Sequence, residues 1–287
     1  MKWVWGDRSI DFSGRTQIMG ILNVTPDSFY DGGRYADSQS AVAKGWALEE
    51  EGADIIDIGG ESSRPPMYGK AEQLTWEEEC RRVVPIIEGV RRRSQIPISI
   101  DTTKAAVARR ALEAGADIIN DISALAADDA MGEVAVRHGA SVILMHRRGT
   151  SDTMQCDTHY DNLVDEISCH LEERIGHACN CGIEPGRIAV DPGLGFGKSV
   201  AGNLCLINQL EAFVGLGFPV LVGASRKSFI WKSTGTDVEN ALEGSLAAAV
   251  LCVIKGCHML RVHDVAATVR AVRLAEAVLG GGAGNSQ

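Results

Sequence analysis

The chain has 287 residues, of which 45% are hydrophobic and 23% charged, with a formal net charge of −10 and a mean hydropathy of −0.01. This composition is typical of a soluble globular protein, and the length suits one α/β barrel as well as two smaller domains. The negative charge disfavours nucleic acid and anionic membranes as the main partners, although local basic residues could still bind an anionic substrate.

Short apolar runs alternate with longer amphipathic stretches along the whole chain. The runs predict strands at Gln17–Leu22, Asp54–Ile58, Ile98–Ile100, Asp117–Asn120, Ser141–Met145, Arg187–Val190, Pro219–Val222 and Met259–Val262. The stretches between them predict helices at Ser38–Glu51, Trp76–Arg93, Lys104–Ala114, Tyr160–Cys179, Leu204–Phe213, Asn240–Lys255 and Val265–Leu279. Two of these helices end just before Gly52 and Gly115, and glycine favours the left-handed conformation that a tight turn into the next strand needs.

Eight strands, each followed by a helix, predict a single-domain (β/α)8 TIM barrel over residues 1–280. Residues 1–13 are expected to form a short hairpin that plugs the bottom of the barrel, and residues 281–287 a flexible tail. The main alternative is an open doubly wound sheet, which the absence of a Rossmann glycine fingerprint after the first strand disfavours.

Neither a secretory signal nor a membrane span is predicted. Residues 1–12 lack a long apolar run, and the apolar run 246–254 is too short to cross a bilayer. The eight cysteines contain no CxxC pair, which predicts reduced thiols and a cytoplasmic location. The spacing of His177, Cys179 and Cys181 matches no common zinc pattern, so we expect no metal there.

Polar residues follow the end of every predicted strand. In chain order they are Asn23, Glu61-Ser62-Ser63-Arg64, Asp101, Asn120-Asp121, Met145-His146, Asp191, Ser225-Arg226-Lys227 and Arg261-Val262-His263. Any one of them has a structural explanation, such as Asp101 capping the next helix. Polar residues at all eight ends are harder to explain in this way, and in a TIM barrel these ends converge on one face. The pattern therefore predicts a ligand site there.

The residue types divide this predicted site by chemistry. Carboxylates, an amide and an amine suit a flat, nitrogen-rich heterocycle, and they are Asp101, Asn120, Asp191 and Lys227. Residues suited to phosphate or pyrophosphate are Asn23, Ser62, Ser63, Arg64, Arg261 and His263. Asn23 and nearby acids could hold Mg²⁺ through oxygen ligands. In the segment Asp191–Lys198, three glycines allow close approach of a ligand to the backbone and Phe196 forms an apolar wall.

These residues resemble the dihydropteroate synthase family of folate biosynthesis over nearly the whole chain, from about Trp3 to Leu279. The matching motifs are Gly20–Phe29 with Asp31-Gly32-Gly33, Asp57–Pro65, Ser99–Thr102, Asn120–Ile122, Met145-His146 with Met154-Gln155, Asp191–Lys198, Gly223–Phe229 and Leu260–Val265. So many motifs in the same order make the resemblance highly specific.

The resemblance implies a transferase that condenses 6-hydroxymethyl-7,8-dihydropterin diphosphate with 4-aminobenzoate, by an SN1-like path, to give 7,8-dihydropteroate and pyrophosphate. It implies catalytic roles for Asp101, Lys227, Arg261 and His263, and Mg²⁺ at Asn23. The implied pterin site is Asp101, Asn120, Met145, Asp191, Phe196, Lys227 and Arg261. The implied aminobenzoate site is Phe29, Ser63, Arg64, Pro65, Phe196, Ser225 and Lys227. Pyrophosphate would contact Asn23, Ser63, Arg64, Arg261 and His263.

The family further implies a homodimer, and mobile lids over Thr25–Arg34 and Ser62–Thr75. Two departures stand out. Pro66-Met67-Tyr68-Gly69 forms an apparent insertion beside the aminobenzoate site. It is either a tolerated loop extension or a device that excludes sulfonamides and confers resistance to them. The second departure is Arg147-Arg148, to which the sequence assigns no role.

Two other functions share the barrel and the pterin carboxylates. One is a pterin-binding methyltransferase, which would not need Lys227 together with Arg261 and His263. The other is a non-catalytic pterin-binding paralogue, which should have lost some of the polar groups at the strand ends. None of the key groups is missing here.

Overall fold

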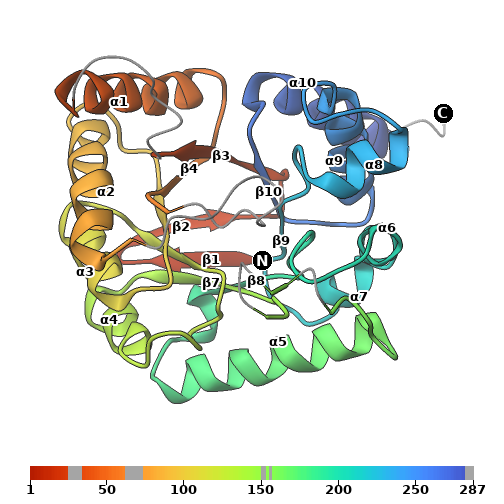
Figure 1. Ribbon diagram of the computed structural model, residues 1–287, viewed down its shortest axis with the longest axis horizontal. Helices are drawn as coiled ribbons and strands as arrows, with labels where there is room; N and C mark the ends of the chain where they lie inside the picture. The colour runs from red at the N-terminus through yellow and green to blue at the C-terminus, as the bar shows by residue number, and fades with distance from the viewer. Residues whose placement is uncertain (25–33, 62–73, 150–152, 155–156, 282–287) are drawn as a thin grey trace.

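The computed structural model describes residues 1–24, 34–61, 74–149, 153–154 and 157–281. Helices surround a central set of strands, and the amino-terminal hairpin crosses the middle of the view (Figure 1). The expected flexible tail, both expected lids and the insertion at 66–69 lie wholly or largely outside the described residues.

Eight parallel strands form the barrel. They are β3 (Gln17–Asn23), β4 (Ile55–Gly59), β5 (Ile98–Asp101), β6 (Ile118–Asp121), β7 (Ser141–Met145), β8 (Ile188–Asp191), β9 (Leu221–Val222) and β10 (Met259–Val262). The pairing order is β8-β7-β6-β5-β4-β3-β10-β9. A parallel bridge between Val190 and Val220 joins the two end strands and closes the barrel. The predicted TIM barrel is therefore confirmed, and the open doubly wound sheet is wrong.

The helices follow the strands around the ring. They are α1 (Arg34–Glu50), α2 (Trp76–Arg91), α3 (Ala105–Glu113), α4 (Met131–His138), α5 (Leu163–Asn180), α6 (Val200–Asn208), α7 (Glu211–Val214), α8 (Ser228–Thr234), α9 (Leu242–Ile254) and α10 (Val265–Gly281). The helix predicted over 204–213 was wrong in extent, because Ser199 caps an earlier start and the stretch divides into α6 and α7. Among the described helices, none combines the length and apolar content that a bilayer-spanning segment needs.

The amino-terminal hairpin closes the bottom of the barrel, as predicted. Strands β1 (Lys2–Trp5) and β2 (Arg8–Asp11) pair antiparallel. Trp3 and Trp5 are buried and belong to a core cluster with one inward side chain from most barrel strands: Met19, Ile55, Ile118, Ile143, Ala189, Leu221 and Met259. A separate and larger apolar cluster fills the layer between strands and helices. The two buried tryptophans make the lower barrel a packed apolar core.

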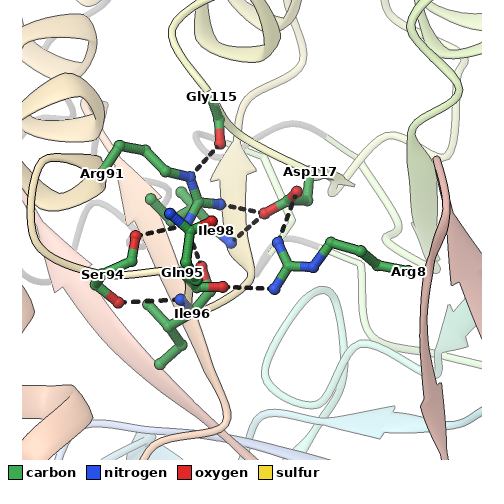
Figure 2. A network of polar contacts seen from close by, with 8 residues as sticks. All are labelled: Arg8, Arg91, Ser94, Gln95, Ile96, Ile98, Gly115 and Asp117. Carbon is green, nitrogen blue, oxygen red and sulfur yellow. Dashed lines mark hydrogen bonds and ion pairs between the residues drawn. The ribbon is translucent and has the colours of Figure 1, made fainter.

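A polar network fastens the helices to the amino ends of the strands (Figure 2). The guanidinium of Arg91, at the end of α2, donates to the carbonyl oxygens of Gly115 and Ile96 and to the carboxylate of Asp117. Asp117 also accepts from the Ile98 backbone N–H at 2.9 Å and from Arg8 of the hairpin at 3.4 Å. The hairpin, α2 and β5 are thus held together by protein groups that satisfy one another.

Candidate active site

The inward side chains of the strands change from apolar to polar toward the carboxyl ends. Side chains two residues apart on a strand point to the same face. On four strands, an apolar residue of the lower core is followed two positions later by a polar residue on the same face. These pairs are Ile55 and Asp57, Ile118 and Asn120, Ala189 and Asp191, and Met259 and Arg261. The three new acceptors in this set, Asp57, Asn120 and Asp191, are all less than 5% exposed. The inner side of the upper barrel is therefore lined by polar side chains, which lie above a hydrophobic floor.

The register of the strands places several predicted site residues at the same height along the barrel axis. Asn23 pairs with Gly59, Gly59 with Asp101, and Asp101 with Asn120 across four neighbouring strands. On the next pair of strands, Met145 lies beside Asp191. The prediction that these residues gather at one mouth of a closed barrel is supported by this register.

Arg261 links two acids, the fully buried Asp57 and the partly buried Asp101. Its Nε donates to Asp57 Oδ2 at 2.6 Å and its Nη2 donates to Asp101 Oδ2 at 2.8 Å. Asp57 also accepts from the amide of Asn120 at 3.3 Å. Asp57 was not among the predicted site residues, although a carboxylate inside the apolar run Ile55–Gly59 is a signal that could have found it. Its position makes it the acid that orients Arg261 and Asn120 from below.

Burial shifts the ionisation of this cluster. It raises the pKa of Asp101 to about 7, with Arg261 opposing the rise and Asp57 adding to it. It also raises the pKa of Asp191, against the nearby charge of Lys227. Burial by itself lowers the pKa of Arg261, but Asp57 and Asp101 together raise it above its ordinary value. Arg261 is therefore a permanent cation beside Asp101, whose carboxyl ionises near neutral pH.

Lys227 is held by the segment that follows β8. Its ammonium donates to the Leu194 carbonyl and lies 4.5 Å from the centre of the Phe196 ring. A side chain at Gly195 would come within 3.0 Å of the Lys227 Cδ, and Gly195 has a φ of +85°. Burial lowers the pKa of Lys227 to about 8, which Asp191 partly opposes and Arg261 reinforces.

Lys198 holds the backbone of the segment that follows β8. It is 3% exposed, and its ammonium contacts the carbonyl oxygens of Gly193 at 2.8 Å and Phe196 at 3.0 Å. It also contacts Nδ1 of His146 at 2.8 Å, and the Gly193 N–H donates to Asp191 at 2.7 Å. Sequence reasoning placed Lys198 in a motif but did not find this structural role. The structure gives His146, predicted only as a strand-end residue, the role of its partner.

Ser225 and His263 lie together at the end of β10. The Ser225 hydroxyl accepts from the His263 backbone N–H at 3.2 Å and contacts the His263 Nδ1 at 3.1 Å. Asn23 is half-buried at the end of β3. The remaining predicted residues lie outside the described residues, and they are Phe29, Ser62, Ser63, Arg64 and Pro65.

Arg148, for which the sequence gave no role, anchors the chain that leads into α5. Its guanidinium lies 3.8 Å from the Tyr160 ring centre and donates to Glu166 at 3.0 Å. Tyr160 in turn donates to the Gly197 carbonyl at 3.0 Å. Arg147 is half-buried near Asp121, and burial lowers its pKa despite that acid.

The chain matches the family described as pterin binding enzyme over residues 19–263. It is 43% identical to dihydropteroate synthase of Escherichia coli K12, covering 97% of each chain. The structure of Xanthomonas albilineans dihydropteroate synthase with 4-aminobenzoic acid superposes with a TM-score of 0.89 at 43% identity, covering 97% of this chain and 98% of that one. The structure of that synthase with 7,8-dihydropteroate gives 0.86 at 41% identity, covering 97% and 99%. The chain therefore belongs to the pterin-binding enzyme family, as a transferase of its dihydropteroate synthase group.

Proposed function

We propose that the protein condenses 6-hydroxymethyl-7,8-dihydropterin diphosphate with 4-aminobenzoate to give 7,8-dihydropteroate and pyrophosphate. The observation that carries the proposal is a polar cluster above a hydrophobic floor, in which Asn120 and Asp191 are buried and Asp101, Lys227 and Arg261 are partly buried. The relatives solved with 4-aminobenzoic acid and with 7,8-dihydropteroate support it, since they share the fold over almost the whole chain.

The pterin would lie on the floor of the mouth, flat against Met145. Asp191 would accept from the ring amino group and an adjacent ring N–H, because a carboxylate can take two parallel charge-assisted bonds. Asn120 and Lys227 would complete the edge contacts. The aminobenzoate site would lie nearer to solvent. It would be formed by Phe29, Ser63, Arg64, Pro65, Phe196, Ser225 and Lys227.

The reaction would begin with cleavage of the bond between the pterin methylene and the diphosphate oxygen, which keeps the electron pair. The methylene cation is delocalised into the ring, and Asp101 stabilises it as a carboxylate. The aminobenzoate nitrogen then forms the new C–N bond and loses a proton. Arg261 and His263, with Ser63 and Arg64, would bind the departing pyrophosphate.

Mg²⁺ would neutralise the diphosphate when bound. Asn23 offers one suitable amide oxygen, which is half-buried at the strand end. The described residues contain no group of three or more His, Cys, Asp or Glu residues that could hold a metal by themselves. This donor set fits an ion held by one protein oxygen, the substrate phosphates and water, which is a common arrangement for Mg²⁺.

The test is release of pyrophosphate on mixing the pterin diphosphate, 4-aminobenzoate and Mg²⁺ with the protein. We expect turnover that needs both substrates. A methyltransferase or a non-catalytic pterin-binding protein would bind the pterin and release no pyrophosphate, which would overturn the proposal. A dependence of the rate on Mg²⁺ that Asn23→Ala weakens would support the proposed metal site.

We also propose that the insertion Pro66–Gly69 makes the enzyme insensitive to sulfonamides, through a bulkier rim around the aminobenzoate site. This proposal depends on the sequence alone. Inhibition by sulfamethoxazole should be weak for the full chain and stronger for a variant that lacks residues 66–69, with the KM for 4-aminobenzoate kept within about threefold as the control. Equal inhibition of the two proteins would refute it.

We propose a homodimer because two neighbouring helices expose large apolar side chains. Leu251 and Ile254 of α9 and Leu274 and Val278 of α10 are each more than half exposed, and α9 packs beside α10. Such a patch is more typical of a subunit interface than of a free surface. Light scattering should show a dimer that L274E/V278E breaks and V136E, at an exposed valine on α4, does not. A monomeric wild-type protein would contradict it. The cytoplasmic location stays a prediction from the sequence.

A further inference from the structure

The tight turn that carries Lys227 has an unusual residue at its third position. The Lys227 N–H donates to the Ala224 carbonyl oxygen at 3.2 Å and closes the turn Ala224-Ser225-Arg226-Lys227. Arg226 occupies this position with a φ of +57°. Glycine or asparagine normally fills such a site, since a side chain with a β-carbon is strained there. Something in the structure must hold Arg226 in this conformation.

The Arg226 side chain makes a two-point ion pair across to the next strand end. Its Nε donates to Asp264 Oδ2 at 2.8 Å and its Nη2 donates to Asp264 Oδ1 at 2.7 Å. Its backbone N–H donates to the Ser245 hydroxyl at 3.0 Å, in the first turn of α9. The pair is partly shielded, with the two side chains 34% and 24% exposed. A planar guanidinium that makes two parallel bonds to a carboxylate fixes the orientation of both side chains as well as their separation.

Asp264 is itself well fixed. It comes directly after His263, and its carbonyl oxygen accepts from both the backbone N–H and the hydroxyl of Thr268 in the first turn of α10. The ion pair with Arg226 lowers the pKa of Asp264, so the acid stays charged at neutral pH. Ser225 contacts His263 and Arg226 contacts Asp264, so two consecutive residues of the turn are joined to two consecutive residues after β10.

We propose that Arg226 is a positioning residue, whose pair with Asp264 holds the strained turn so that Ser225 and Lys227 face His263 and Phe196. This inference rests on the proposed function, because the residues it positions are those assigned to the two substrates. Arg226 need not touch a substrate for this role. It acts through the backbone of its two neighbours.

Arg226→Ala and Arg226→Gly separate this role from the alternatives. Both remove the guanidinium, but glycine tolerates the positive φ and alanine does not. We expect Arg226→Ala to lower kcat/KM for both substrates about tenfold or more and Arg226→Gly to lower it only about threefold. Equal losses would show that the guanidinium itself matters and would overturn the inference. Unchanged kcat/KM in both variants, with a lower melting temperature, would show a role in stability only.

A second comparison covers the case in which Arg226→Ala does not fold. Asp264→Asn should lower kcat/KM in the wild type and have no further effect when combined with Arg226→Gly, since the pair is already absent. Equal effects in the two backgrounds would overturn the inference. Arg110→Ala, at an exposed pair with Glu113 on α3, is the matched control and should leave kcat/KM within about twofold. Absence of pyrophosphate release by the wild type would instead refute the proposed function.

Discussion

The two ends of the barrel each place an arginine among acceptors, but they satisfy it differently. At the amino end, Arg91 donates to backbone carbonyls and to Asp117, and Asp117 receives further bonds from Arg8 and Ile98. At the carboxyl end, Arg261 lies between the two carboxylates of Asp57 and Asp101, and the pKa of Asp101 is raised to about 7.

This difference separates stability from function. At the amino end, Arg91 donates hydrogen bonds to backbone carbonyl oxygens that would otherwise be buried without a donor. Such networks stabilise the fold. The carboxyl end concentrates buried charge that is only partly balanced, which is unfavourable for folding and useful for binding a polar substrate. Substitutions at the carboxyl end should therefore lower activity more than stability, and substitutions at the amino end should lower stability more than activity.

The largest expected effect is that of Asp101→Asn on catalysis. Loss of the carboxylate removes the charge opposite the developing cation, and we expect kcat to fall about 10²–10³-fold. The melting temperature at neutral pH should stay the same or rise, because the raised pKa means that the ionised Asp101 carboxylate destabilises the folded state, and Arg261 keeps its ion pair with Asp57. Asp117→Asn is the matched control at the other end, and it should lower the melting temperature with kcat unchanged. A stable Asp101→Asn protein with normal kcat would break the comparison.

The next effect is that of Arg91→Met on stability. The carbonyl oxygens of Gly115 and Ile96 lose their donor and Asp117 loses its main partner, so we expect about 2–3 kcal/mol less stability and a melting temperature about 5 °C lower. Pyrophosphate release by the folded protein should be unchanged. Arg93 pairs with Glu50 and its side chain is 59% exposed, so Arg93→Met should change stability by less than about 0.5 kcal/mol. Equal losses in the two variants would contradict the assigned role of Arg91.

The smallest expected effect is the pH dependence of kcat/KM, which depends on single groups in the site. Asp101 must be ionised to stabilise a cation, and its pKa of about 7 predicts that kcat/KM falls about tenfold per pH unit below that value. Lys227 must be protonated to donate to the pterin, and its pKa of about 8 predicts a fall above that value. The initial rate of pyrophosphate release between pH 5.5 and 9.5 would test both limbs, and a flat profile across this range would rule the assignment out.

Local patterns predicted most of the architecture. The strands at Ser141–Met145 and Met259–Val262 agree with the structure residue for residue, and others differ by one or a few residues at their ends. Helices α4 and α8 were not predicted, since Met131–His138 and Ser228–Thr234 are short and each begins without a side-chain cap. Tertiary packing sustains helices of that length in the absence of a strong local signal.

The sequence by itself determined which residues end the strands, because the alternation of apolar runs and polar ends is a local property that the barrel topology converts into one mouth. Only the tertiary structure decided how those residues pair. Arg261 meets Asp57 across 204 residues, Lys198 meets His146 across 52, and Arg226 meets Asp264 across 38. Each pair depends on the direction of two side chains that lie on, or shortly after, different strands, and no periodicity within either segment encodes it.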